Sequence, residues 1–319
     1  MNPIQQTSIE TNKPRILLPK VFGKMLRKPK FVISLSIIVL IYGLGISAPL
    51  VAPQSYYEQN LSQSKISPNR NHILGTDFLG RDVASRLIYS LRTNLIITFA
   101  AVITGSLFIG VALGLIAGYF GGRIDSVIMR VGDVFLAFPG LLLVILLAAT
   151  LRPRIIEMVR SFENIFGLNG LVRWGIPDYL LIFGALAAFS WVGIARLTRG
   201  QVLSLKRTVY VEAAEALGAS PTHILLKHIL PNALPPIIVV ITMGMGTLAG
   251  AEVMLSWLGI GIQPPAPSLG NMIREGQDIS ILRNYPHLLI PPVIIVGLLI
   301  FSWNMLGDAL NDLWNPKIR

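Results

Sequence analysis

The sequence predicts an all-α polytopic membrane protein with six transmembrane helices. Of its 319 residues, 53% are hydrophobic and only 13% are charged, and the mean hydropathy is +0.64. These values lie outside the range of soluble globular proteins. Six apolar runs have a length suited to crossing a bilayer, at residues 31–51, 95–120, 131–151, 179–195, 237–262 and 288–306.

The first 30 residues predict the orientation of the chain. They carry seven Lys or Arg side chains and one acid, Glu10, and the apolar run that follows has no charge. That run is too long for the core of a signal peptide, and no small-residue cleavage site follows it, so we expect an uncleaved first span with a cytoplasmic N-terminus. Six spans then return the C-terminus to the cytoplasm and place residues 196–236 there as well.

The predicted organisation has four parts. Residues 1–30 form a basic cytoplasmic segment, and residues 31–94 form the first transmembrane helix and an external segment. Residues 95–309 form the main transmembrane domain with a cytoplasmic loop at 208–232, and residues 310–319 form a cytoplasmic tail. Residues 152–178 are expected to be an external loop. The net charge of +11 lies beside apolar spans and therefore suits anionic lipid rather than nucleic acid.

Small residues and prolines in the spans predict how the helices pack and bend. Gly110, Gly114 and Gly118 recur at every fourth position and leave a smooth strip for close approach of another helix within the bundle. The same spacing recurs in the fifth span. Pro139 in the third span and the proline pair at 291–292 in the sixth should bend or break their helices.

The stretch at 210–231 predicts a helix, a break and a second helix. Gly218 can end the first helix in a left-handed turn, Ser220 can cap the second, and Pro221 suits its first position. Pro231 and the proline pair at 235–236 are expected to stop the second helix. A short helical hairpin that projects from a membrane domain offers another protein a surface to hold.

A glycine-rich external stretch at 72–82 precedes the second span. Gly75 and Gly80 permit tight turns, Asp77 and Asp82 can cap helix starts, and Arg81 can bridge to a carbonyl or carboxylate. We expect a rigid, hydrogen-bonded start to the second span.

Glu252 is the one carboxylate well inside an apolar run. A charged group in lipid is unfavourable, so Glu252 should face the bundle or an aqueous path. Both a path-lining role and a helix-packing hydrogen bond fit this position.

The sequence predicts no catalytic residue, cofactor site or metal site on this chain. His223 and His228 are five residues apart and are not expected to share a helix face, and there is no cysteine. No GxxxxGK[ST] phosphate loop is present, so we do not expect the chain to bind ATP.

Several motifs together resemble the C-type permease subunit of the ABC importers for oligopeptides, dipeptides and nickel. They are EAA at 212–214 with Gly218 and Leu230-Pro231, HILPN at 228–232, GTDFLGRD at 75–82, LSWLGIGIQPPAPSLGNM at 255–272 and MLGD at 305–308. Trp257 and Leu269 stand where this family usually has Phe and Trp. The resemblance extends over most of the chain.

The resemblance implies a type I ABC importer fold in which an EAA loop, residues 208–232 here, docks into an ATPase subunit. The residues that match this loop are Glu212, Ala213, Ala214, Gly218, Ser220, Pro221, Leu230 and Pro231. The residues that match an external structural or gate motif are Gly75, Thr76, Asp77, Gly80, Arg81, Asp82, Gln263, Pro264 and Pro265.

The resemblance also implies the partners. They are a homologous B-type permease, two ATPase subunits that hold ATP and Mg, and an extracytoplasmic solute-binding protein, all at the bacterial cytoplasmic (inner) membrane. The solute would be a peptide or a related small molecule such as a nickel chelate, and the chain itself would not be an enzyme.

Two alternatives remain at this point. A stand-alone secondary transporter or channel would need ion-coupling groups in its spans, where only Glu252 is available, and an inverted repeat, which is not evident. A membrane-embedded enzyme would need Asp, His, Ser or Cys groups that converge at membrane depth, and none cluster in the sequence.

Overall fold

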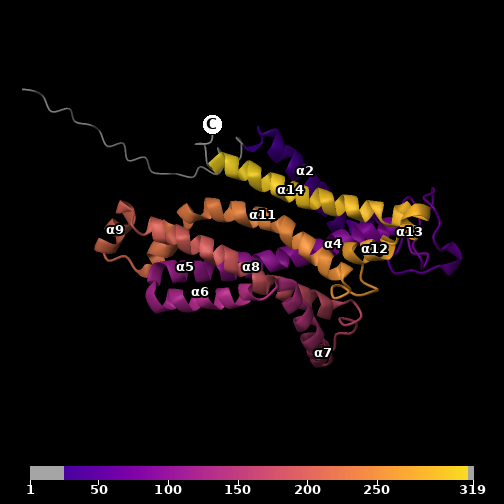
Figure 1. Cartoon of the computed structure of the whole chain (residues 1–319), viewed down its shortest axis with the longest axis horizontal. Coiled ribbons are helices and arrows are strands. Elements are labelled where there is room, and N and C mark those ends of the chain that lie inside the picture. Colours follow the sequence, from indigo (N-terminus) through magenta and orange to yellow (C-terminus); the bar gives the residue numbers. More distant parts are fainter. Residues whose placement is uncertain (1–24, 315–319) are drawn as a thin grey trace, which may run out of the picture.

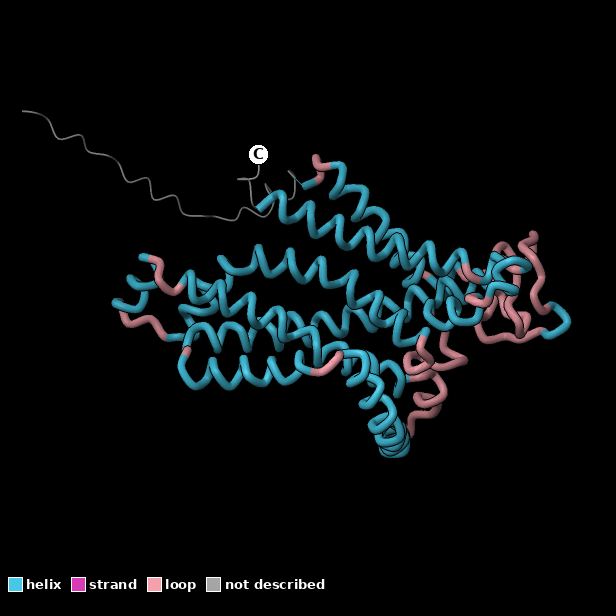
Figure 2. Tube along the Cα trace, viewed as in Figure 1, coloured by secondary structure: helices cyan, strands magenta, loops and turns pink. Residues whose placement is uncertain are grey.

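The computed structural model describes residues 25–314, which are helical apart from connecting turns and loops (Figures 1 and 2). Within these residues there is no strand, only an isolated bridge between Thr76 and Asp82. The predicted all-helical class is therefore confirmed. Most of the predicted basic segment at 1–30, and the second half of the predicted tail at 310–319, lie outside the described residues.

In residues 25–314, five helical stretches are long and apolar enough to cross a membrane, and a sixth results if one bent pair counts as a single span. The five are α2 (Pro29–Ile46), α4–η2–α5 (Val83–Ala101, Val102–Gly110, Val111–Phe120), α8 (Ile176–Leu205), α10–η3–α11 (Pro221–His223, Ile224–Ile229, Leu230–Trp257) and η4–α14 (Pro286–Leu288, Ile290–Trp314). The bent pair is α6 (Gly122–Ala137) and α7 (Gly140–Phe166). The short helices are α3 (Ala48–Val51), η1 (Leu61–Gln63), α9 (Val209–Ala216), α12 (Leu269–Gly276) and α13 (Ile279–Asn284).

The long helices run side by side between two ends of an elongated bundle (Figure 1). Helix α9 lies at one end, and α12 and α13 lie at the other. Helices α2, α4, α11 and α14 share the largest core, which contains Tyr42 and Trp303 with their ring centroids 6.3 Å apart. The EAA loop and the GTDFLGRD motif are therefore at opposite ends of the molecule.

Helix α4 begins 12 residues before the second apolar run because Asp82 caps it. The Asp82 Oδ2 atom accepts a hydrogen bond from the Ser85 backbone N–H (2.8 Å), which satisfies one of the free donors at the helix start. The first two turns include the polar residues Ser85, Arg86 and Ser90, and all three are buried. Residues 54–82 cover these turns, and we call this segment the cap, as distinct from the single capping residue Asp82.

The third predicted span is broken into two helices that meet at 93°. Pro139 disfavours helical backbone at the residue before it, and Phe138 is indeed extended. The predicted bend is confirmed, but residues 131–151 do not form a single span.

The expected external loop at 152–178 is also wrong in its first half, because α7 continues to Phe166 and projects from the bundle (Figure 1).

The glycine strip of the second span packs against α8, as predicted. A Cβ atom at Gly114 would lie 2.5 Å from the Thr198 Cβ and 2.6 Å from the Ala195 carbonyl oxygen. Gly110 and Gly118 meet α8 in the same way. In the fifth span, a Cβ atom at Gly246 would lie 3.2 Å from the Ile300 carbonyl oxygen of α14. These glycines permit contact between helices of one chain.

Replacing Gly114 with alanine should therefore lower stability. The added methyl group has no room, and overpacking of this kind costs about 1–3 kcal/mol. Thermal unfolding in detergent measures the effect. Gly193→Ala, on an exposed face of α8 with no atom within 4 Å of the new Cβ, is the matched control and should leave the unfolding midpoint unchanged or raise it. Equal midpoints for the two variants would contradict the close-packing interpretation.

Candidate functional site

The EAA loop has the predicted helix, break and second helix. Helix α9 ends at Gly218, which takes φ +79°, and the N–H groups of Gly218 and Ala219 donate to the carbonyls of Glu215 (2.9 Å) and Ala214 (3.0 Å). This paired bonding is a Schellman motif, in which a left-handed residue satisfies the last free carbonyls of a helix. Ser220 then caps the next helix and Pro221 opens it.

The second helix does not stop at the prolines, and that prediction is wrong. It continues from Pro221 to Trp257 through the π-helical turn η3 and α11, with Pro235 and Pro236 inside α11. Pro231 lies inside this continuous path and donates no backbone hydrogen bond. Next to it, the Asn232 side-chain amide donates to the His228 carbonyl (2.6 Å). The EAA loop is therefore directly continuous with the fifth span.

One side of the EAA loop is anchored in the bundle and the other is exposed. Val211, Ile224 and Ile229 are fully buried in a cluster with residues of α5, α8 and α11. In contrast, Val209 is 82% exposed and Leu217 is 88% exposed, and Glu212 and Gly218 are exposed beside them. Sequence reasoning did not identify Val209 and Leu217, because exposure of an apolar residue depends on the tertiary fold.

His223 and His228 lie close together, contrary to the prediction. Their ring centroids are 5.6 Å apart because His223 directly precedes a π-helical turn that contains His228, and each backbone bond of such a turn spans five residues. The Tyr210 ring lies 6.5 Å from His228. The described residues contain no group of three or more His, Cys, Asp or Glu side chains placed to hold a metal ion.

At the opposite end, a buried ionic network joins the cap to α12. Arg86 lies between Asp77 and Glu275, with 2.6 Å to the second carboxylate, and Arg81 donates to Asp77 (2.7 Å). Asp77, Arg81 and Arg86 are all buried. Arg81 thus bridges to a carboxylate as predicted. Arg86 and Glu275 were not predicted, since they are 189 residues apart in the sequence.

The two aspartates of the GTDFLGRD motif have different roles. Asp82 caps α4 as predicted, and its other oxygen lies 3.0 Å from the His72 Nδ1 atom. Asp77 caps no α-helix; its Oδ1 atom accepts the N–H groups of Leu79 (2.8 Å) and Arg81 (3.0 Å) and so closes a turn. Gly75 and Gly80 have the positive φ of the predicted turns, and the Thr76 hydroxyl, also buried, accepts the Ile66 N–H (2.8 Å).

The loop after α11 is held against α8. The Gln263 N–H donates to the Asp178 Oδ2 atom (3.1 Å), and the Gln263 side-chain amide donates to two carbonyls of its own loop (2.9 and 3.0 Å). Asp178 also pairs with Arg152 of α7 (2.8 Å). Pro264 and Pro265, joined by a cis peptide bond, are exposed. The loop thereby links the fifth span, α8 and α7.

Glu252 is fully buried in the bundle and does not line a cavity. Its Oε2 atom accepts the Asn94 amide (2.7 Å), and its Oε1 atom accepts the hydroxyls of Ser256 (3.0 Å) and Ser268 (3.3 Å). Asn94 in turn accepts the Tyr42 hydroxyl (3.3 Å). Of the two roles left open by the sequence, the geometry favours the packing hydrogen bond over the path-lining one.

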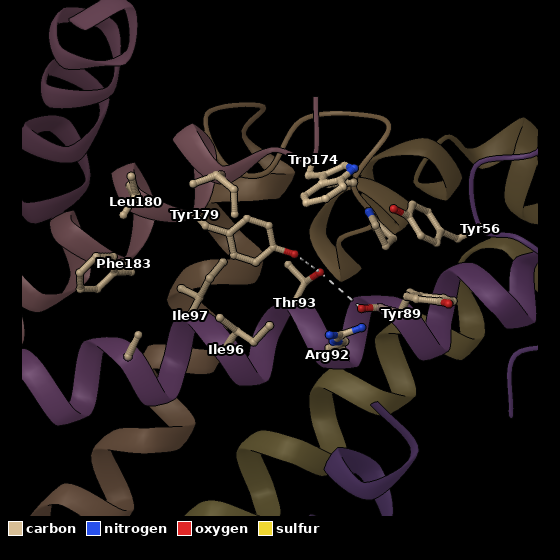
Figure 3. Close-up of a pocket in the computed structure, with 14 residues that line it drawn as sticks. Tyr56, Tyr89, Arg92, Thr93, Ile96, Ile97, Trp174, Tyr179, Leu180 and Phe183 are labelled. Atoms are coloured by element: carbon tan, nitrogen blue, oxygen red, sulfur yellow. Dashed lines mark hydrogen bonds between the residues drawn. The ribbon is translucent and has the colours of Figure 1, made fainter. Parts of the chain in front are cut away.

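A cavity of about 550 Å³ lies between α4 and α8, close to the end that carries the cap (Figure 3). Aromatic and aliphatic side chains form most of its wall, and Arg92 is the one residue with a full charge in the lining. The Tyr179 hydroxyl points toward Thr93 and bonds to it (2.9 Å). The lining residues are Tyr56, Tyr89, Arg92, Thr93, Ile96, Ile97, Ala100, Trp174, Ile176, Tyr179, Leu180, Phe183, Ala266 and Pro267.

Tyr56 reaches this cavity from the cap. Its ring packs against Tyr89 with centroids 4.6 Å apart. Burial raises the pKa of the Tyr56 hydroxyl, and the neighbouring tyrosines add to this effect while the Arg92 charge opposes it. The Tyr56 hydroxyl therefore stays neutral at physiological pH and brings no negative charge near Arg92.

The family of the chain follows from comparison with known proteins. Residues 110–319 match the family described as binding-protein-dependent transport system inner membrane component, and residues 20–69 match the N-terminal TM domain of oligopeptide transport permease C. The chain belongs to this transport family. The resemblance drawn from the sequence motifs is confirmed. The EAA loop and the loop at 258–268 lie within the longer match, whereas the GTDFLGRD motif and Arg92 lie between the two matched regions.

Curated permeases are similar over most of this chain. The dipeptide transport system permease protein DppC of Alkalihalophilus pseudofirmus is 37% identical, over 93% of this chain and 89% of that protein. The oligopeptide transport system permease protein OppC of Bacillus subtilis is 37% identical, over 90% and 85%. The glutathione transport system permease protein GsiD of Pectobacterium atrosepticum is 36% identical, over 79% and 75%.

A solved structure of the MetNI methionine ABC transporter in an inward-facing form also aligns, over 70% of this chain and 96% of that one, with a TM-score of 0.48 and 22% identity. The family match over residues 110–319 and the membrane-spanning helices identify this chain as a multi-pass membrane permease of a binding-protein-dependent transport system.

Proposed function

We propose that this permease forms half of the translocation path of an ATP-driven importer for peptides or a related small solute, such as a nickel chelate. It pairs with a homologous B-type permease, two ATPase subunits bind its EAA loop and that of its partner, and an extracytoplasmic binding protein delivers solute at the cap end. The relatives named for dipeptide, oligopeptide and glutathione transport support the class of solute.

The main support for this proposal is that the EAA loop has an exposed outer side and a buried inner side. Val209 and Leu217 expose apolar surface at its outer side, beside the carboxylate of Glu212. Large exposed apolar side chains that are rimmed by polar groups are typical of a protein contact site. Val211 and Ile224, on the inner side, are fully buried and fix the loop to the bundle.

The loop is also built to transmit movement. The helical path from Pro221 to Trp257 is continuous, so a displacement of the EAA loop is carried along the whole fifth span. Directly after Trp257 comes the loop with Gln263, and Ala266 and Pro267 of that loop line the cavity. Closure of the ATPase subunits would therefore move the cavity wall at the opposite end of the molecule.

The remaining roles are assigned to the partners. ATP and Mg would bind to the ATPase subunits, and this chain would carry no catalytic residue. Both termini would be cytoplasmic in the bacterial inner membrane, with the basic N-terminal residues beside anionic lipid and no nucleic acid involved.

Affinity purification of the tagged chain in gentle detergent, followed by uptake assays in proteoliposomes, tests this function. We expect a second permease and ATPase subunits to copurify, and peptide uptake to require both ATP and the binding protein. Uptake by the chain alone, driven by an ion gradient and without an ATPase, would instead identify a secondary transporter or channel.

A further inference from the structure

The cavity between α4 and α8 is lined by Arg92, whose positive charge has no carboxylate partner within residues 25–314. We propose that Arg92 binds a free carboxylate of the transported solute, and that the cavity wall receives an apolar or aromatic side chain next to that carboxylate (Figure 3). This inference rests on the proposed function, because it takes the cavity as part of the solute path.

The charge environment of Arg92 differs from that of its neighbour Arg86 on the same helix. Arg86 is buried and pairs with Asp77 and Glu275, whereas Arg92 is exposed and pairs with no carboxylate in residues 25–314. A guanidinium has five N–H donors and no acceptor, and its planar fork matches a carboxylate. The cavity therefore presents an unused site for an anionic, planar group.

No carboxylate in the described structure competes for this site. Asp178, on the first turn of α8, is held by Arg152 (2.8 Å) and by the Gln263 N–H (3.1 Å). Glu252 is enclosed in the bundle. The lining thus contains one cation and no anion, so it distinguishes the carboxylate of a solute from an ammonium group.

The walls around Arg92 suit an apolar neighbour of that carboxylate. Trp174, Tyr179 and Phe183 face the cavity from the α8 side, and Ile96 and Ile97 face it from α4 (Figure 3). Apolar walls exclude water and strengthen the attraction between a guanidinium and a carboxylate. A volume of about 550 Å³ is within the usual range for small-molecule sites.

The position of Arg92 along α4 also favours a polar occupant of the cavity. It lies nine residues after the start of α4, just before the apolar run at 95–120. A charged side chain this close to the hydrocarbon region is expected to face water or an opposite charge rather than lipid. The cavity provides the aqueous space, and the solute provides the charge.

The test uses the complete transporter in proteoliposomes, with tri-leucine and its C-terminal amide as probes. We expect Arg92→Gln to lower tri-leucine uptake by about tenfold or more, consistent with loss of a charge-assisted bond, and to change uptake of the amide by less than about twofold. Arg92→Lys should retain part of the preference. Any preference of the binding protein is the same for every variant, so a change in the ratio of the two rates isolates Arg92.

Arg70→Gln is the matched control, because Arg70 is an exposed cation of the cap outside the cavity lining. It should leave both uptake rates unchanged. An unchanged acid-to-amide ratio in Arg92→Gln would overturn the inference. Equal loss of both probes, together with loss of the second permease from the complex, would overturn it as well and would assign Arg92 to an ion pair with that permease.

A binding measurement separates this inference from the proposed function. Trp174 lines the cavity, so its fluorescence in the purified complex should respond to tri-leucine more strongly than to the amide, and Arg92→Gln should remove the difference. Equal responses of the wild type to both probes would contradict the carboxylate site alone. Absence of ATP-driven uptake in a complex that still distinguishes the probes would contradict the importer function alone.

Discussion

Replacing Gly218 with proline is expected to abolish ATP-driven uptake while the permease remains inserted and paired. Gly218 has φ +79° and donates its N–H to the Glu215 carbonyl (2.9 Å), whereas proline is restricted to φ near −65° and has no N–H. The turn between α9 and the fifth span would therefore change direction, and the exposed surface with Val209 and Leu217 would no longer face the ATPase. Uptake in proteoliposomes and recovery of the ATPase subunits measure the effect.

A graded series at Gly218 tests the reason for this loss. Asparagine tolerates the left-handed region and should retain most of the uptake, whereas alanine should fall between asparagine and proline, since the left-handed conformation costs a non-glycine residue about 1–2 kcal/mol. Glu212→Lys changes charge on the exposed face without altering the backbone and should also prevent coupling. Wild-type uptake by a properly inserted Gly218→Pro protein would show that this loop does not transmit movement.

Replacing Arg86 with alanine should produce the largest loss of stability. The substitution leaves Asp77 buried with one fewer cation and takes two hydrogen bonds from Glu275 (2.6 and 3.0 Å). Removing one member of a buried ionic network costs about 3–5 kcal/mol, and here it leaves Arg81 as the one cation within residues 25–314 for the buried carboxylate of Asp77. Unfolding in detergent, followed by circular dichroism, measures the change.

The design includes two further variants. Arg70→Ala removes an exposed cation from the same cap and should change the free energy of unfolding by less than about 0.5 kcal/mol. If Arg86→Ala does not accumulate in the membrane, Glu275→Gln reports on the same network with a smaller loss, because the Glu275 side chain is 26% exposed. Stability of Arg86→Ala within about 1 kcal/mol of wild type would mean that the network does not hold the cap.

The ionic network explains how a segment with little regular structure becomes rigid. Between Ala52 and Asp82 the chain has only one short 3₁₀ helix, yet Asp77 and Asp82 are as buried as core residues. Asp77 pairs with Arg86 and Asp82 accepts from Ser85, both on α4, and Arg86 also pairs with Glu275 of α12. The cap, the start of the second span and α12 are therefore connected. The cap can therefore hold Tyr56 in place at the cavity.

Features that depend on neighbouring residues were predicted from the sequence. Hydropathy predicted five of the six apolar spans as single helical stretches. The order of Gly218, Ser220 and Pro221 predicted the break in the EAA loop, because capping and left-handed turns depend on a few consecutive residues. The spacing of Gly110, Gly114 and Gly118 predicted a close helix contact, which the structure places against α8. The motifs, read together, predicted the family.

Features that depend on distant residues were not predicted. Pro235 and Pro236 were expected to end a helix, but both lie inside α11, and the helix continues into the fifth span. The π-helical turn η3 brings His223 and His228 together. The direction of α7 after Pro139 likewise has no signal in its own sequence, because a break in a helix does not specify the angle that follows it.

The sequence alone thus determined the all-helical membrane class, five of the six spans, the turn at Gly218 and the family, since these follow from composition and from contacts between near neighbours. The tertiary structure decided which partners the charged groups have. Glu252 became a packing residue because Asn94 and two serines enclose it, Arg86 became structural because Glu275 reaches it, and Arg92 stayed unpaired beside the cavity. Such pairings join residues far apart in the chain, and only the packing of the helices brings them together.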